Sequence, residues 1–113
     1  MKKIEAIIRP EKLEAVREAL DSSGYPDITI SEIEGHGKQK GTVQQWRGEQ
    51  YKIEFLPKVK VEIVCLNQDL EKILLALQEA AFTGGVGDGK IFVSDITEVV
   101  RIRTKERGEK ALV

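Results

Sequence analysis

Alternation of apolar and polar residues predicts four β-strands in this chain. The pattern is clear in residues 2–9 (KKIEAIIR), and it returns in residues 27–34, 59–65 and 90–95. Alternation with a period of two places one set of side chains on the buried face of a sheet. Residues 97–103 are expected to continue in an extended conformation. The residues expected to face the core from the first three strands are Ile4, Ala6, Ile8, Ile28, Ile30, Ile33, Val59, Val61, Ile63 and Cys65.

Apolar residues at helical spacing predict two helices between these strands. Pro10 suits the first position of the first helix, where its missing N–H is no loss, and this helix is expected to end near residues 22–24. The second helix has apolar residues at i, i+3, i+4 and i+7, with Asn67 or Asp69 available to cap its first turn. The two apolar stripes are formed by Leu13, Val16 and Leu20 and by Leu70, Ile73, Leu74 and Leu77.

The order of these elements is strand, helix, strand, strand, helix, strand. It predicts a single α+β domain over residues 1–113 with the ferredoxin-like split βαβ (βαββαβ) fold. The connection between the second and third strands, residues 35–57, is polar, shows little periodicity and is far longer than a hairpin turn requires. We therefore expect a long functional loop over residues 37–56, and a C-terminal segment over residues 98–113, within this one domain.

Composition and charge narrow the possible function classes. Of 113 residues, 41% are hydrophobic and 33% are charged, so a globular domain is expected. The one cysteine, Cys65, excludes an intrachain disulfide and a zinc site with several thiolates. The chain has no apolar run of about 18 residues and no secretory signal at its start, so the cytoplasm is the expected location. A net charge of −1 argues against a dedicated nucleic-acid-binding protein.

Glycines and basic residues are distributed unevenly. Seven of the ten glycines lie in two short clusters, GHGKQKG at residues 35–41 and TGGVGDGK at residues 83–90. Such clusters mark places where only a bare backbone fits, although flexible turns are the alternative interpretation. Residues 38–60 and 101–110 are locally basic in a chain that is nearly neutral, although a solvated charged face is the alternative interpretation for residues 105–110. This combination favours a small anionic ligand over a long polyanion.

The second glycine cluster resembles a P-loop only superficially. The stretch from Gly84 to Lys90 reads G-x-x-x-x-G-K, but Ile91 stands where a P-loop has Ser or Thr. The expected context also runs from helix to strand, the reverse of a P-loop. Backbone N–H groups of Gly87 and Gly89 are nevertheless suited to cradle phosphate oxygens beside the charge of Lys90. A tight turn from helix to strand is the alternative interpretation.

Two further pairs of residues are candidates for binding. Arg101 and Arg103 alternate on the expected extended segment, so they would share a face and could clamp a polyphosphate. Solvent exposure without a ligand is the alternative for this pair. Trp46 and Tyr51 lie on the polar loop, where packing does not require aromatic residues. They indicate a docking or modification site, unless they fold back onto the domain.

The sequence offers little support for catalysis or for RNA binding. His36 is the only histidine and has no evident partner for a metal site or a triad. Cys65 lies in an apolar strand and is expected to be an inert core residue. A small phosphotransferase on this fold therefore lacks a placed nucleophile or base. An RNA-binding module of this fold needs stacking aromatic residues, and Phe92 is the only one on an expected central strand.

Several stretches of the chain together resemble one known family. They are KKIEAIIRPEKLEAVREAL, GHGKQKG, WRGEQY, FLPKVKVEIV, TGGVGDGKIFV and VVRIRT. In this order and at this spacing they resemble the nitrogen-regulatory P-II signal-transduction family over nearly the whole chain. TGGVGDGKIFV is the most specific of these stretches, and the motif that ends in Tyr51 is the second.

The resemblance implies a homotrimer of ferredoxin-like subunits that bind ATP or ADP competitively in the clefts between neighbours. By position, Thr29 and the backbone at Val64 would meet the adenine, and the second glycine cluster would receive the phosphates. Arg101 and Arg103 would come from the neighbouring subunit. The complete nucleotide site would consist of Thr29, Gly35, His36, Gly37, Lys38, Gln39, Val64, Gly87, Asp88, Gly89, Lys90, Arg101 and Arg103.

The resemblance also implies an effector, an output and a set of partners. 2-Oxoglutarate would bind with Mg²⁺ and ATP, where Gln39 would touch the metal and Gln39, Lys58 and Gly87 would hold the acid. The long loop would then report the bound ligand to ammonium transporters or to the enzymes that modify glutamine synthetase. Tyr51 matches a tyrosine that is uridylylated in some relatives, whereas Glu49 excludes the serine phosphorylation of others.

Three features depart from the family pattern. His36 stands where an aromatic residue is common, and Lys38 replaces a frequent arginine. This second change would turn a bidentate phosphate contact into a point contact. The pair Gly85–Val86 also differs from the usual one before Gly87. A ligand-binding regulator is the function that the resemblance implies, with no catalytic residues.

Overall fold

The computed structural model describes the backbone of residues 1–46 and 49–112 and the side chains of residues 1–34 and 56–112. Four strands and two helices follow one another in the expected order. Short 3₁₀ turns precede both helices and lie near the C-terminus. The main elements are β1 (Lys2–Ile8), α1 (Leu13–Ser22), β2 (Thr29–Trp46), β3 (Glu49–Cys65), α2 (Leu70–Ala81) and β4 (Lys90–Asp95).

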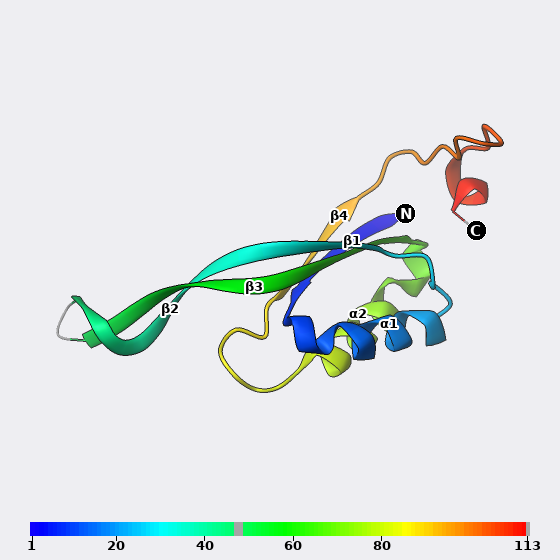
Figure 1. Cartoon of the computed structure of the whole chain (residues 1–113). Helices are drawn as coiled ribbons and strands as arrows, with labels where there is room; N and C mark the ends of the chain where they lie inside the picture. The colour runs from blue at the N-terminus through cyan, green and yellow to red at the C-terminus, as the bar shows by residue number, and fades with distance from the viewer. Residues whose placement is uncertain (47–48, 113) are drawn as a thin grey trace.

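The strands form one antiparallel sheet in the order β2-β3-β1-β4. Strands β1 and β3 are central, and each βαβ unit crosses back so that its strands are not neighbours. This arrangement confirms the predicted ferredoxin-like fold. Both α-helices cover the same face of the sheet, and the opposite face carries no α-helix in the described part of the chain (Figure 1). We call this opposite face the helix-free face.

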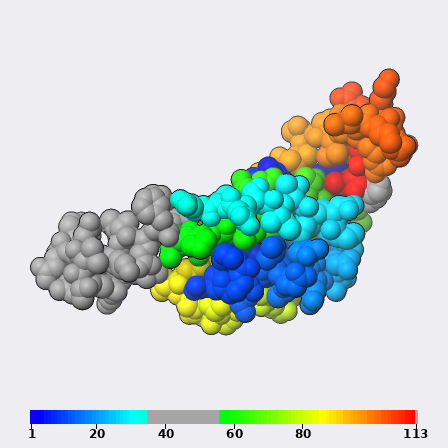
Figure 2. Space-filling model, in the orientation of Figure 1, coloured from blue at the N-terminus to red at the C-terminus, as the bar shows by residue number. Residues whose placement is uncertain are grey.

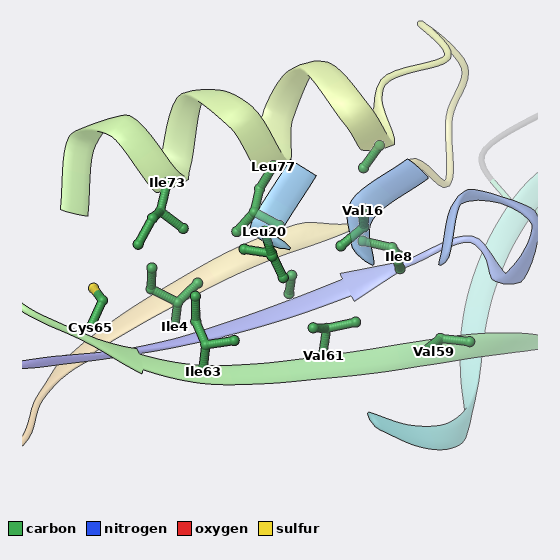
Figure 3. Close-up of a cluster of buried hydrophobic side chains, with 12 residues drawn as sticks. Ile4, Ile8, Val16, Leu20, Val59, Val61, Ile63, Cys65, Ile73 and Leu77 are labelled. Carbon is green, nitrogen blue, oxygen red and sulfur yellow. The ribbon is translucent and has the colours of Figure 1, made fainter. Parts of the chain in front are cut away.

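The core lies between the two helices and the central strands (Figure 3). Every residue predicted to be buried on β1 and β3 is at most 5% exposed, because period-two alternation sends those side chains toward the helices. The helical stripes are confirmed as well, with Val16, Leu20, Ile73 and Leu77 buried. The buried apolar residues are Ile4, Ala6, Ile8, Val16, Leu20, Val59, Val61, Ile63, Cys65, Ile73, Leu77 and Ala81.

The expected core contribution of the second strand is wrong in two places. Ile28 packs partly buried against the core, but Ile30 is 41% exposed, because β2 is an edge strand. Ile33 pairs with Lys58, the residue before buried Val59, so alternation places both on the helix-free face. Ile33 is simply out of phase with Ile30, whereas position at the edge of the sheet decides the exposure of Ile30, and alternation alone does not reveal it. The same holds for Phe92, expected on a central strand, which is 55% exposed on edge strand β4.

The helix limits agree with the sequence-based prediction, whereas the predicted side-chain N-cap of α2 does not form within the described part of the chain. Pro10 opens a 3₁₀ turn ahead of α1, and α1 ends at Ser22 before Gly24, whose φ is +90°. Asp69 occupies the N-cap position of α2, but among the described residues its side chain makes no capping hydrogen bond. Its carboxylate instead accepts the hydroxyl of Tyr25, and this hydroxyl accepts the Leu66 N–H at 3.1 Å. The Asp69 carboxylate, which the sequence offers as a helix cap, thus forms a tertiary hydrogen bond with Tyr25 instead.

The connection between the second and third strands is not the irregular loop that its sequence indicates. Strands β2 and β3 pair from Thr29 opposite Glu62 out to Trp46 opposite Glu49, with one irregularity between Lys40 and Gln44. They form a long hairpin that projects beyond the helices (Figure 1). Antiparallel pairing is made by backbone hydrogen bonds, so it can extend the hairpin where the sequence has no apolar alternation. Residues 47–48 lie outside the described residues.

The C-terminal segment also differs from the expectation. Residues 97–103 do not continue as a strand, because the chain turns back at residues 102–104 and Val100 pairs with Arg107 as an isolated bridge. Lys105 has a φ of +64° in this turn. Arg101 and Arg103 therefore do not alternate on one strand face, and that part of the prediction is wrong. Within the described residues, neither helix has the length and apolar character needed to cross a membrane.

Candidate functional site

Residues 83–89 join α2 to β4 and are called the glycine loop below. The loop lies at the molecular surface (yellow in Figure 2). Gly87 and Gly89 have φ values of +102° and +100°, which L side chains rarely adopt. Gly89 is required for a second reason, because a Cβ built there would lie 1.7 Å from the carbonyl oxygen of Ile7. The loop therefore reaches β4 only by passing directly over the backbone of β1.

Asp88 organises the glycine loop from within. Its carboxylate accepts the N–H groups of Thr83 and Gly84 at 2.8 and 2.9 Å, and it also accepts the Thr83 hydroxyl. These hydrogen bonds, the hydroxyl of Thr83 first, and the guanidinium of Arg9 hold the pKa of Asp88 well below its usual range. The charged carboxylate is thus committed to the loop itself.

Two cations of the central part of the sheet, one directly after β1 and one within β3, also bind the glycine loop. Arg9 follows β1 and donates from Nε to Asp88 Oδ1 at 3.0 Å and from Nη2 to the Val86 carbonyl at 2.8 Å. Lys58 of β3 donates from Nζ to the Gly87 carbonyl. Sequence reasoning named Lys58 only through the family resemblance and missed Arg9 altogether. The available signal for Arg9 was a cation in phase with the polar face of β1, directly before Pro10.

Alternation assigns these cations to the helix-free face of the sheet. Arg9 and Lys58 extend the polar phase of β1 and β3, and Lys90 pairs with Ile7 of the same phase. Lys90 is exposed. Arg9 and Lys58 thus contact a loop in which Gly87 and Gly89 have left-handed backbone conformations, and Lys90 directly follows it, an arrangement that suits a small anion. The predicted neighbours Gly87, Asp88, Gly89 and Lys90 are brought together with Lys58 by this geometry.

A second cavity lies toward the other end of the strands. It has a volume of about 420 Å³, and it brings together Thr29, Val64 and Arg101 of one chain. Arg101 donates to Glu106 Oε1 at 3.2 Å and to the Ala111 carbonyl at 3.3 Å. The expected contribution of Arg101 from a neighbouring subunit stays a prediction.

The floor of this second cavity is charged. Glu62 lies between Lys60 at 3.2 Å and Lys3 at 3.5 Å, and Lys3 also contacts Glu5 at 2.9 Å. The hydrogen bond from Lys60, followed by the charge of Lys3, lowers the pKa of Glu62. This part of the helix-free face therefore carries paired charges of both signs, unlike the cationic surroundings of the glycine loop.

The remaining predicted residues are less clearly placed. Arg103 is exposed in the C-terminal turn, apart from any strand. The backbone from Gly35 to Gln39 pairs with residues 52–56 of β3, close in sequence to Lys58. The side chains of residues 35–55 lie outside the described residues, and these include predicted site residues. The predicted residues concerned are Gly35, His36, Gly37, Lys38, Gln39 and Tyr51.

Groups that could act in catalysis or bind metal were also located. Cys65 is fully buried in the core, as predicted, and burial raises the pKa of its thiol. Within the part of the chain that the structure describes, no three His, Cys, Asp or Glu side chains gather as a metal site. The chemistry that the described residues offer is electrostatic and hydrogen-bonded recognition of an anion.

Comparison with known proteins places these features in a family context. The family model "Nitrogen regulatory protein P-II" matches residues 1–106. The chain is 53% identical over 112 residues to Nitrogen regulatory protein P-II of Rhizobium meliloti (strain 1021), with 99% of this chain and 100% of the relative covered. It is 46% identical over 112 residues to Nitrogen regulatory protein GlnK of Escherichia coli (strain K12), with the same coverage.

Solved structures agree with this result. The crystal structure of Arabidopsis thaliana PII bound to citrate matches with a TM-score of 0.80 and 38% identity, covering 98% of this chain and 88% of the other. The structure of B. subtilis GlnK matches with a TM-score of 0.82 and 32% identity, covering 98% of this chain and 97% of the other. Both alignments extend over nearly the whole fold described above.

Proposed function

Because the chain belongs to the nitrogen regulatory protein P-II family, we propose that it reports nitrogen status by binding ATP or ADP together with 2-oxoglutarate. A regulatory role in nitrogen metabolism follows from the family itself. The ligands and the targets are the finer parts of the proposal. The relatives named above are called regulatory proteins, and binding, not turnover, is the activity proposed here.

The cationic glycine loop is the observation that carries the nucleotide proposal. Arg9 and Lys58 contact a loop with left-handed Gly87 and Gly89, Lys90 directly follows it, and this is a suitable place for phosphates. Asp88 would contribute through its backbone, because its carboxylate is engaged by Thr83, Gly84 and Arg9.

The distance to the second cavity supports the same ligand. Ile7 of β1 pairs with Lys60 of β3 on one side and with Lys90 of β4 on the other. Val64 lies four positions beyond Lys60 on β3. Four residues of strand span about 13 Å. Phosphates at the glycine loop and a base near Thr29 and Val64 are therefore within the reach of one nucleotide on the helix-free face.

The proposal for 2-oxoglutarate rests on Lys58 and on a relative. Lys58 presents its ammonium group beside Gly87, where it could balance a carboxylate. The solved structure of Arabidopsis thaliana PII bound to citrate shows a small polycarboxylate on a related protein. Binding of the acid would place it next to the base of the hairpin formed by β2 and β3.

Magnesium would be coordinated mainly by the bound nucleotide, the oxo acid and water, and less by protein side chains. The described residues contain no cluster of three acidic, His or Cys side chains, so they offer no dedicated cage for the ion. Mg²⁺ commonly takes one or two protein ligands together with waters and phosphates, so the amide of Gln39 is a sufficient protein contribution. The bound ion would supply positive charge between phosphates and the oxo acid.

The long hairpin is the proposed output, and a homotrimer is the proposed assembly. Residues 37–46 and 49–56 lie on β2 and β3, and β3 continues from them to Lys58, so ligand contacts at Lys58 can bias the hairpin. Ammonium transporters and enzymes that modify glutamine synthetase are the proposed classes of target, in the cytoplasm. Tyr51 is the proposed modification site.

Light scattering of the protein in solution tests the proposed assembly, and the mass of a trimer is expected.

Calorimetric titration tests the proposal directly. ATP and ADP, added separately to the purified protein, are expected to bind and to compete with each other. 2-Oxoglutarate is expected to bind in the presence of ATP and Mg²⁺ and to bind more weakly when either is omitted. Absence of heat with both nucleotides at millimolar concentration would refute the proposed function.

A further inference from the structure

We propose that Arg9 is a positioning residue that holds the glycine loop in its anion-receiving conformation. The proposal rests on the proposed nucleotide binding at this loop. Arg9 would act through the loop backbone and not through a contact with the ligand. It lies just beyond β1, and it reaches a loop 77 to 79 positions later in the chain.

One guanidinium makes two separate contacts with the loop. Nε donates to the carboxylate of Asp88 at 3.0 Å, and Nη2 donates to the carbonyl of Val86 at 2.8 Å. These acceptors flank Gly87 on both sides. Because the guanidinium is planar and its N–H groups have fixed directions, the two bonds together fix how the chain passes through Gly87.

Gly87 is the position where such control is needed. Its φ of +102° is one of many conformations that a glycine can adopt, so the residue does not select it by itself. Lys58 Nζ also donates a hydrogen bond to the Gly87 carbonyl. A Cβ built on Gly87 would lie 3.3 Å from Arg9 Nη2, so the guanidinium packs directly against this part of the loop.

The ion pair between Arg9 and Asp88 is partly shielded from solvent. The side chains of Arg9 and Asp88 are 27% and 24% exposed, less than those of a typical surface pair such as Arg17 and Glu14 at 53% and 71%. Partial burial strengthens a charge-assisted hydrogen bond relative to one in water. A loop ordered before ligand arrives costs less to order on binding, which raises affinity.

Lysine cannot substitute fully for Arg9 in this role. Its ammonium is a single point of charge on a flexible stem, so it can pair with Asp88 or approach Val86 but does not present two fixed N–H groups to both. Arg9→Lys therefore preserves charge and separates positioning from simple electrostatic attraction. Arg17→Ala on α1 is a matched control, because it removes an exposed arginine whose recorded partner is Glu14.

Two measurements on the full-length protein test the proposal. Hydrogen exchange of residues 83–90 in the ligand-free protein reports the order of the loop, and calorimetry reports the affinity for ATP. Arg9→Ala is expected to speed exchange in this segment and to weaken ATP binding about tenfold, as expected for loss of charge-assisted hydrogen bonds. Arg9→Lys should give an intermediate effect on both measurements, and Arg17→Ala should match the wild type.

The outcomes separate this proposal from the one it rests on. If the wild type binds no nucleotide, the proposed function fails, while exchange in the free protein still tests the effect of Arg9 on the loop. If Arg9→Ala binds ATP within about twofold of Arg17→Ala, positioning is refuted. Weaker binding with unchanged loop exchange also refutes it, because Arg9 would then act on the ligand directly. If Arg9→Ala does not fold, Arg9→Lys is judged by the same two criteria.

Discussion

Individual atoms decide the shape of the glycine loop. Gly89 has no side chain because the Ile7 carbonyl occupies the space where a Cβ would be, and Asp88 is charged because two N–H groups and a hydroxyl converge on it. Both constraints concern the loop and its neighbouring strand, before any ligand is considered. They can therefore be tested by stability measurements alone.

Substitution of Gly89 should lower the unfolding free energy because of its close approach to Ile7, and Gly24 provides a control for the effect of positive φ alone. Gly89→Ala places a Cβ 1.7 Å from a backbone oxygen at a φ of +100°, so we expect a loss of at least about 3 kcal/mol in unfolding free energy. Gly24→Ala has a similar φ of +90° but no atom within 4 Å, so about 1 kcal/mol is expected. Urea denaturation measures both. Equal losses of unfolding free energy would show that the contact between a Cβ at position 89 and the Ile7 carbonyl adds nothing to the cost.

Asp88 should make stability depend on pH in the acid range. Its pKa in the folded protein lies well below the value of about 3.9 for a free aspartate, chiefly because of hydrogen bonds from Thr83. Its contribution to stability is therefore complete above that value and is lost as the pH falls through the folded-state pKa. We expect the unfolding free energy of the wild type to fall more steeply below about pH 4 than that of Asp88→Asn.

Other carboxylates titrate in both proteins, so the difference between the two pH profiles isolates Asp88. Urea denaturation at a series of pH values provides the measurement. Parallel profiles for wild type and Asp88→Asn would contradict the assignment of Asp88 as a stabilising carboxylate.

At the scale of elements, helix α2 shows how burial divides one helix into two faces. Leu77 is 1% exposed and packs in the core, whereas Leu75, on the same helix, is 58% exposed. The hairpin of β2 and β3 shows the opposite situation, because regular backbone pairing continues where the sequence has no apolar alternation. Burial leaves a pattern in the sequence, and backbone pairing on its own does not.

Two substitutions on α2 test this division. Leu77→Ala should lower the unfolding free energy by about 2–5 kcal/mol, because it leaves a cavity against the sheet. Leu75→Ala removes the same atoms from a mostly exposed position, and a change within about 0.5 kcal/mol is expected. Thermal and urea unfolding of both variants provide the comparison. A similar loss in both would mean that α2 buries a different face.

At the scale of the whole molecule, the fold collects charge that is scattered in the sequence. The net charge is only −1, yet Arg9 after β1, Lys58 within β3 and Lys90 at the start of β4 all lie at one loop. Any ligand that binds there binds the folded chain alone, so binding must raise the stability of the fold.

This linkage gives a prediction for Lys90. ATP at about 100 times its dissociation constant should stabilise the wild type by about 2.7 kcal/mol. At the same ATP concentration Lys90→Ala should gain clearly less, because a cation beside the proposed phosphate position is lost. Lys72→Ala on exposed α2 surface should gain as much as the wild type. Melting curves with and without ATP measure the shifts, and equal shifts for all three proteins would remove Lys90 from the site.

Sequence reasoning predicted the α+β order of elements, the ferredoxin-like fold, the core of β1 and β3 and the limits of β4. It was wrong about the hairpin, about the C-terminal extended segment and about Ile30 and Ile33. Of the candidate site, the glycine loop with Lys58 and Lys90 was identified in advance, Lys58 through the family resemblance. Arg9 was not identified, because its phase on β1 indicates only the face on which it lies, and its partners are 77 to 79 positions later in the chain.

The amino-acid sequence by itself determined which residues are buried in the central strands and helices, because burial imposes a period of two or 3.6 that can be read from neighbouring positions. It also determined the glycines that the loop requires. Only the tertiary structure decided which strand is an edge and which carboxylate accepts which N–H. It also brought Arg9 to a loop 79 positions away. The strand order and the contacts of Arg9 join segments that are distant along the chain, so they exist only after the sheet has formed. The hydrogen bonds from Thr83 and Gly84 to Asp88 are local, but they require the folded conformation of the glycine loop.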